Sequence, residues 1–158
     1  MAGLTILSGG QTGIDRAALD AAIASGIAYG GWCPKGGWAE DLPHPPGLLT
    51  LYPHLQQTPL AEPAQRTEWN VRDCDRLMLL VDRAGLQSSP GSEAAREFAV
   101  AMGKPHVVID LDAADALTRA RAFLAGARNV TVLCVGGPRE SEAPGIYAKA
   151  RVFLSQLL

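Results

Sequence analysis

Short runs of apolar residues alternate with amphipathic stretches along the whole chain. The apolar runs predict strands at Leu4–Leu7, Ile27–Gly31, Arg76–Val81, Val107–Ile109 and Val130–Val135, with a further candidate at Leu48–Tyr52. The stretches between them predict helices at Asp15–Ser25, Arg66–Asp73, Glu93–Met102 and Ala113–Leu124, and a last helix that begins near Pro144. This alternation predicts βαβ units with right-handed crossovers. We therefore expect one α/β domain, residues 1–158, with a doubly wound, mostly parallel sheet.

Two helices carry additional local signals. Ser92 is a suitable N-cap for the third helix, and Gly103 with Pro105 just beyond it marks the end of that helix. The last helix repeats its apolar residues at helical spacing, which predicts a face directed to the core: Ile146, Ala150, Phe153, Leu154 and Leu157.

Composition limits the classes of function. The chain has 158 residues, of which 47% are apolar and 19% charged, and this balance suits a sheet covered on both faces. A net charge of -2 offers no basic field, so nucleic acid is not an expected partner. The three cysteines lack metal-ligand spacing and no metal site is expected. No apolar run approaches the ~20 residues that span a bilayer. Scattered thiols and the absence of such a run predict a cytoplasmic protein without a membrane partner.

The first strand-to-helix loop, Ser8–Arg16, has the sequence SGGQTGIDR. Its glycines allow sharp turns that present backbone N–H groups, and the following helix adds partial positive charge, so both features favour a phosphate. The spacing departs from the dinucleotide fingerprint, because Ser8 stands at the position of the first glycine. The alternative is a tight turn with no ligand. The candidate binding residues of this loop are Ser8, Gly9, Gly10, Gln11, Thr12, Gly13 and Asp15.

Two later loops are predicted at the same carboxyl edge of the sheet, where open α/β folds bind ligands. In the first, GLQSSPGS at Gly85–Ser92, the candidates Gly91 and Ser92 could contact an anion or only begin a helix. In the second, VGGPRES at Val135–Ser141, an arginine suited to gripping phosphate stands among glycines, although it could also be an ordinary surface residue. The candidates there are Gly137, Arg139, Glu140 and Ser141. Three such loops at one edge favour a binding site.

Two other segments supply candidates. GGWCPKGGWAED contains Lys35, which could meet a phosphate, and Trp32 and Trp38, either of which could stack on a heterocycle or belong to the core. Arg66 shares a predicted helix face with Asn70 and Asp73, and such a polar face commonly meets solvent. The stretch 36–63 is long for a loop, so we expect it to be functional or partly structured.

Four segments together resemble the molybdenum carrier family, also described as a circularly permuted YpsA branch of the SLOG superfamily. They are SGGQTGIDRAALDAA, GGWCPKGGWAED, RTEWNVRDCD and GGPRESEAPGIY, and the resemblance covers nearly the whole chain. The superfamily includes the lonely guy phosphoribohydrolases and DprA. The resemblance implies a Rossmann-like fold, a nucleotide-type or molybdopterin-type ligand at the loops already identified, and a homo-oligomer.

The chain departs from its catalytic relatives at one position. The lonely guy enzymes carry PGGxGTxxE with a catalytic final Glu, and alignment of GT with Gly91 and Ser92 places Ala95 at that position. The leading hypothesis is therefore a binding or carrier protein for a phosphorylated small molecule, either a nucleotide or molybdenum cofactor, with no required cofactor. A nucleotide hydrolase that uses a carboxylate such as Asp15 or Glu140 is one alternative. A nucleotide-sensing signalling protein is another.

Overall fold

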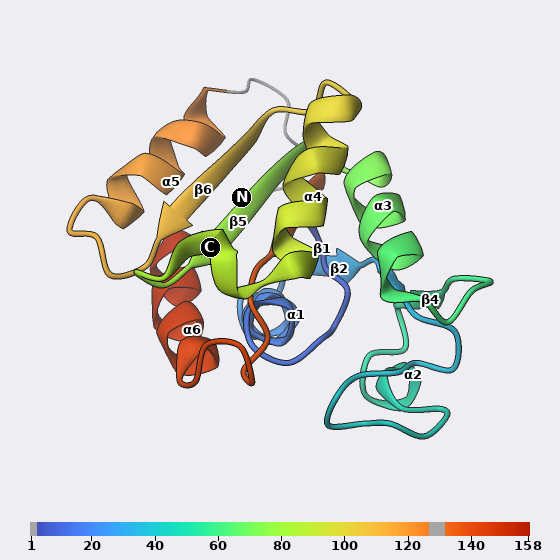
Figure 1. The fold of residues 1–158 in the computed structure, drawn as a ribbon. Coiled ribbons are helices and arrows are strands. Elements are labelled where there is room, and N and C mark those ends of the chain that lie inside the picture. The colour runs from blue at the N-terminus through green and yellow to red at the C-terminus, as the bar shows by residue number, and fades with distance from the viewer. Residues whose placement is uncertain (1–2, 127–131) are drawn as a thin grey trace.

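The computed structural model describes residues 3–126 and 132–158. Its central sheet contains five parallel strands in the order β2-β1-β7-β5-β6 (Figure 1). In chain order they are β1 Thr5–Leu7, β2 Ala28–Gly30, β5 Arg76–Val81, β6 His106–Asp110 and β7 Val132–Gly136. The chain leaves β1 toward one edge, reaches the other edge at β6 and returns to the middle with β7. The predicted α/β class and parallel sheet are confirmed.

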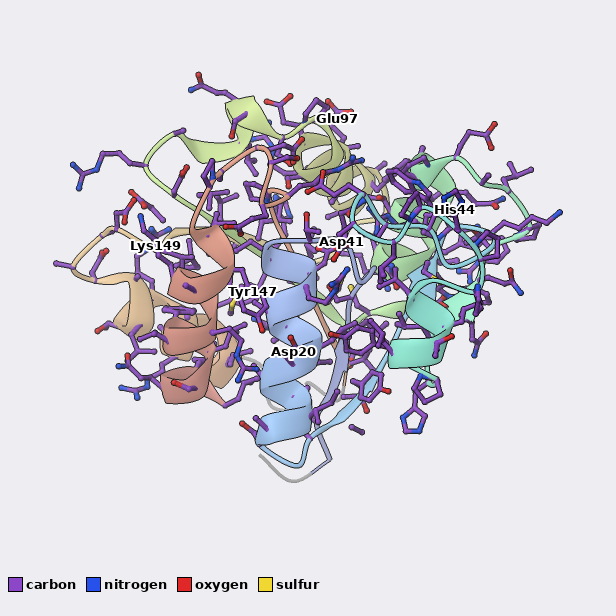
Figure 2. All side chains as sticks on the ribbon, turned by 90° about the horizontal axis from the view of Figure 1, so that it is seen from below. Asp20, Asp41, His44, Glu97, Tyr147 and Lys149 are labelled. Carbon is purple, nitrogen blue, oxygen red and sulfur yellow. The ribbon has the colours of Figure 1, made fainter. Side chains whose placement is uncertain are left out.

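Helices cover both faces of this sheet. The first face carries α1 Ile14–Ala24, α5 Ala116–Ala125 and α6 Ile146–Leu157, and the second carries α3 Pro63–Asp73 and α4 Pro90–Ala101 (Figure 1). Strand β5 shows the division, because Met78 and Leu80 pack in the first layer while Leu77 and Leu79 pack in the second. The predicted apolar face of the last helix is confirmed, since all five of its residues are buried. Figure 2 shows α6 beside α1, where the Tyr147 hydroxyl donates to Asp20 over 2.7 Å.

The 36–63 segment folds into a small unit of its own beside α1. It contains the helix α2 Leu48–Leu51 and the strand β4 Gln56–Gln57, which pairs in parallel with β3 Trp32–Cys33. A separate apolar cluster supports it: Leu19, Cys33, Ala39, Leu48, Tyr52 and Leu55. Tyr52 also donates a hydrogen bond to Asp20 on α1 over 2.6 Å. The segment is therefore structured and anchored to the main domain.

One of the predicted strands needs correction, and another is confirmed with slightly shorter bounds. Leu48–Tyr52 is not a strand: Gly47 turns the chain at φ 49°, and Tyr52 N–H then closes a helical turn on the Leu48 carbonyl. The predicted strand at Ile27–Gly31 is confirmed as β2, Ala28–Gly30, and Gly31 at φ 126° then redirects the chain into the second sheet. A Cβ at Gly31 would lie 2.4 Å from the Ser8 carbonyl oxygen, so this close approach requires glycine.

Helix starts also differ from their predictions. Ser92 is not an N-cap, because α4 already begins at Pro90, a residue suited to the first helical position, and the N-cap is Ser89. The Ser89 and Ser92 hydroxyls instead bond each other at 2.7 Å. Helix α5 begins at Ala116, after a turn closed by Ala116 N–H on the Ala113 carbonyl. Residues 130 and 131 of the predicted last strand lie outside the described ranges. No helix within those ranges has the length and apolar character that crossing a membrane requires.

Candidate functional site

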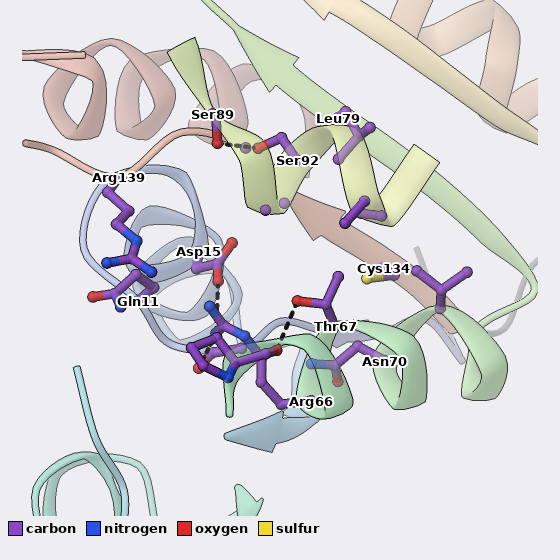
Figure 3. Close-up of a pocket in the computed structure, with 18 of the residues that line it drawn as sticks. Gln11, Asp15, Arg66, Thr67, Asn70, Leu79, Ser89, Ser92, Cys134 and Arg139 are labelled. Carbon is purple, nitrogen blue, oxygen red and sulfur yellow. Dashed lines mark hydrogen bonds and ion pairs between the residues drawn. The ribbon is translucent and has the colours of Figure 1, made fainter. Parts of the chain in front are cut away.

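A cavity of about 300 Å³ lies at the carboxyl ends of β1, β5 and β7 (Figure 3). All three predicted loops line it, together with the inner side of α3, as expected for loops that follow parallel strands. The sequence-predicted candidates that line the cavity are Gly9, Gln11, Asp15, Arg66, Gly91, Ser92, Gly137 and Arg139. The candidates Ser8, Gly10, Thr12, Gly13, Lys35, Glu140 and Ser141 are not part of its lining.

Several of the candidates outside the lining hold the loops together. Ser8 Oγ donates to the Val135 carbonyl over 2.7 Å, and Ile14 N–H donates to the Pro138 carbonyl over 3.2 Å. Gly13 has φ 78°, and a Cβ there would stand 2.3 Å from the Pro138 carbonyl oxygen. Gly13 therefore permits close contact between the first and third loops, and these contacts fix the two loops relative to each other.

Arg66 reaches the cavity from α3 and is almost fully buried. One terminal nitrogen donates to the Gly9 carbonyl over 3.1 Å and lies 3.4 Å from a carboxylate oxygen of Asp15. Across residues 3–126 and 132–158, the buried Nε of Arg66 and Nε2 of Gln11 have no hydrogen-bond partner. An unsatisfied buried donor costs ~1–3 kcal/mol. Arg66 and Gln11 both line the cavity, so these two unsatisfied donors lie just behind its wall, and an acceptor bound there is a suitable partner for them after a small shift of the side chains.

Asp15 faces Arg66 across the base of the same cavity (Figure 3). Burial raises the pKa of the Asp15 carboxyl above its ordinary value, and the neighbouring Arg66 charge offsets only part of that increase. Asp15 therefore keeps its proton to higher pH than an exposed aspartate does. A cavity carboxyl of this kind can serve as a hydrogen-bond donor or as a general acid or base.

Replacement of Asp15 by Asn should change the pH dependence of stability. Because the pKa of Asp15 is raised on folding, the folded wild type binds more protons than the unfolded chain between the two pKa values. Its free energy of unfolding therefore falls as pH rises through that window, whereas Asn does not titrate. Urea denaturation at several pH values should show the Asn variant gaining stability relative to wild type as pH rises above about 4, the ordinary pKa of an aspartate in the unfolded chain.

Asp112→Asn is the matched control, because a hydrogen bond from Lys149 lowers the pKa of Asp112. That control should change its stability relative to wild type only below about pH 4, with the opposite sign, and should keep a nearly constant difference above it. A stability difference between wild type and Asp15→Asn that stays constant with pH would contradict the assignment.

Arg139 lines the cavity from the third loop, with 32% of its side chain exposed. Its guanidinium lies 5.5 Å from the centre of the Trp38 ring and 3.9 Å from a carboxylate oxygen of Glu40. In the described part of the chain, this guanidinium donates no hydrogen bond. An arginine that is positioned by a ring and a loose ion pair, with its planar donors free, suits the bidentate binding of phosphate.

The amino end of α4 forms another wall of the cavity. Ser89, Pro90, Gly91 and Ser92 all belong to its lining. Gly91 has open space around it, since a Cβ there would meet nothing within 4 Å. The N–H groups of Ser92 and Glu93 donate to the Ser89 carbonyl, so this end adds to the attraction of the two arginines for an anion through the partial positive charge of its first turn.

The remaining candidates have structural roles or lie away from the cavity. The Glu140 carboxylate accepts from the N–H groups of Gly145 and Tyr147, and it therefore begins α6 instead of contacting the cavity. Lys35 is exposed, and neither Trp32 nor Trp38 lines the cavity. Asn70, by contrast, is buried in the lining, where its side chain bonds both backbone groups of Trp32.

Sequence reasoning did not identify the apolar side of the cavity. It is formed by small and apolar residues, of which the sequence analysis singled out only Ala95: Ala64, Val71, Leu77, Leu79, Ala94, Ala95, Cys134 and Val135. A hydrogen bond with Cys74 and burial raise the pKa of the Cys134 thiol well above its usual value, so this thiol is neutral and a poor nucleophile. The cavity thus has one polar, cationic side and one apolar side, as small-molecule sites commonly do.

Comparisons with known proteins agree with this geometry. Residues 6–158 match the model of a family described as the circularly permutated YpsA SLOG family. A crystal structure named "Putative molybdenum carrier protein", from Syntrophus aciditrophicus SB, is 38% identical. The match covers 98% of this chain and 94% of that chain, with a TM-score of 0.85. A comparison with curated proteins found no match.

Proposed function

The chain belongs to the circularly permuted YpsA SLOG family, and on that premise we propose that it is a binding or carrier protein for a phosphorylated heterocyclic ligand. The observation that carries this proposal is the pair of buried, unpartnered donors of Arg66 and Gln11 on the cavity wall. A phosphate offers several acceptor oxygens and a negative charge. It would satisfy these donors together with the free guanidinium of Arg139.

The apolar wall of the cavity, opposite the arginines, indicates that the rest of the ligand is a ring system. Side chains such as Val71, Leu79 and Ala95 offer an apolar surface on which a flat ring system can pack. This arrangement replaces the tryptophan contact expected from the sequence. A nucleotide fits the combination of phosphate and ring. Molybdenum cofactor also fits it, because it joins a pterin to a phosphate and carries its metal on its own dithiolene.

A nucleotide hydrolase is the second candidate, and Asp15 is the observation that favours it. Its carboxyl lies in the cavity with a raised pKa, which suits proton transfer. Against this, the position that resembles the catalytic Glu of the lonely guy enzymes is Ala95, whose side chain cannot exchange a proton. The carrier is therefore our first proposal.

The experiment is a comparison of AMP, inorganic phosphate and adenosine as stabilising ligands. AMP should raise the melting temperature by mass action, phosphate should do so at higher concentration, and adenosine should have little effect, because only the first two engage the arginines. Equal shifts with AMP and adenosine, or no shift with any of them, would contradict the proposal. The same AMP samples test the carrier against the enzyme, since release of free adenine at about 1 per second or faster would establish a hydrolase.

We also place the protein in the cytoplasm, in keeping with three buried, free cysteines that suit a reducing compartment. The homo-oligomer implied by the family resemblance stays a prediction.

A further inference from the structure

The carboxylate of Glu40 lies in a set of donors that belong to two of the cavity loops. Thr12 Oγ1 of the first loop donates to one of its oxygens. Ser141 of the third loop donates through Oγ over 2.6 Å and through its backbone N–H over 3.4 Å. Arg139 contributes its charge at 3.9 Å. We call these groups the Glu40 cradle, formed by the donors Thr12 and Ser141 and the charge of Arg139.

The cradle is a built anion site, because an anion is held in it. Burial alone would raise the pKa of Glu40, but the hydrogen bonds from Ser141 and Thr12 outweigh burial and lower it, so the carboxylate is charged at neutral pH. Hydroxyl, backbone N–H and guanidinium groups are also the donors that proteins use for phosphate. The glycine loops thus bind an acidic side chain of the same protein with phosphate-type chemistry.

Glu40 reaches this position from the 36–63 segment and not from the sheet. A tight turn carries it, in which Ala39 and Leu42 exchange backbone hydrogen bonds of 3.2 and 2.9 Å. Trp38, two residues before Glu40, is the ring over which Arg139 lies. Both side chains that position the Arg139 guanidinium therefore belong to one short stretch of this segment.

A phosphate that approaches Arg139 from the cavity meets the negative charge of Glu40 on the other side of the same guanidinium. We infer that the Glu40 cradle is a second anion-binding position, in which Glu40 competes with the phosphate group of the ligand. Binding of the ligand releases Glu40 and loosens the turn that carries it, so the 36–63 segment responds to occupancy of the cavity. This inference rests on the proposed function, because it requires a phosphate at Arg139.

The test compares the affinity for inorganic phosphate of wild type and Glu40→Gln, measured from the dependence of the melting temperature on phosphate concentration at constant ionic strength. Removal of the competing charge should tighten phosphate binding about tenfold, the size expected for one unit charge a few ångströms away at a protein surface. Glu40→Ala should behave in the same way, which keeps the test valid if one variant folds poorly.

Asp41→Asn is the matched control, because it removes the same charge one residue away. Asp41 is paired with Arg16 at 2.9 Å and belongs to neither the cradle nor the cavity lining, so this variant should change phosphate affinity less than about twofold. An equal gain in both variants would show a general charge effect and overturn the inference. Unchanged or weaker phosphate binding in both Glu40 variants would also overturn it, and would show that Glu40 only braces the loops.

A second readout follows the movement itself. In wild type, phosphate should change the tryptophan fluorescence, because Trp38 separates from Arg139 when Glu40 is released, and Trp38→Phe should remove that change. A fluorescence that stays constant while phosphate stabilises the protein would overturn the inference and leave the proposed function intact. If phosphate stabilises neither wild type nor any variant, both proposals fail together.

Discussion

Gly13→Ala should lower the melting temperature by about 5–15 °C. Gly13 has φ 78° and ψ -128°, a combination that suits glycine and costs any other L-residue ~1–3 kcal/mol. The new Cβ would also stand 2.3 Å from the Pro138 carbonyl oxygen and 2.8 Å from the Arg139 carbonyl carbon, both backbone atoms that cannot turn aside. Overpacking of this kind adds ~1–3 kcal/mol. A domain of this size loses roughly 2–4 °C per kcal/mol.

Gly26→Ala separates the two causes. Gly26 has a similar φ of 67° but stands in open space, so its replacement carries only the conformational cost and should lower the melting temperature by about 2–6 °C. Differential scanning calorimetry of both variants measures the difference. Equal decreases in melting temperature would show that the first and third loops can separate at little cost in free energy. The two loops would then not form one rigid wall.

The fold was predictable because its signals are local and repeated. Arg76–Val81 is apolar at nearly every position, and a strand buried on both faces needs that pattern. The last helix repeats its apolar residues at helical spacing, and the structure buries all of them. Order along the chain then placed the three glycine-rich loops at one edge without further information.

Other features depend on contacts that local sequence does not encode. The 36–63 segment takes its shape from its apolar cluster with α1, so Leu48–Leu51 forms a helix although its residues also suit a strand. The sequence also did not show that glycines of the same loop have different roles. Gly9 lines the cavity while Gly13 packs against another loop, and only the positions of Arg66 and Pro138 distinguish them.

The polar residues of the site were predictable by type but not by partner. Arg66 was expected on a helix face that commonly meets solvent, yet it is buried with its guanidinium on the cavity wall. Glu140 and Ser141 follow a glycine turn suited to an anion. In the structure, carboxylates of the protein itself accept hydrogen bonds from this turn. Glu142 accepts from the Arg139 N–H over 2.8 Å, and Glu40 accepts from Ser141.

Arg139→Ala should weaken the binding of AMP about tenfold or more while leaving the stability of the unliganded protein nearly unchanged. Charge-assisted hydrogen bonds contribute ~1.5–3 kcal/mol each, and the guanidinium has its donors free for them. Its present contacts are a partly exposed ring and a loose ion pair at 3.9 Å, which together stabilise the fold by only about 1 kcal/mol. Arg139→Lys should recover part of the affinity, because a point charge cannot reproduce the planar fork.

Arg96→Ala provides the control for loss of one positive charge. Arg96 is an exposed residue of α4 that does not line the cavity, so its replacement should leave AMP affinity within about twofold of wild type. Arg139→Ala and Arg96→Ala each remove one positive charge, and Arg139→Lys removes none. A difference between them therefore reports position and geometry.

Calorimetric titration of AMP into wild type, Arg139→Ala, Arg139→Lys and Arg96→Ala tests the central claim, that the cavity binds the phosphate of its ligand through the third loop. The predicted order of affinity places wild type and Arg96→Ala together, Arg139→Lys below them and Arg139→Ala at least about tenfold below wild type. Wild-type affinity in Arg139→Ala would contradict the account and leave Arg139 as an ordinary surface residue.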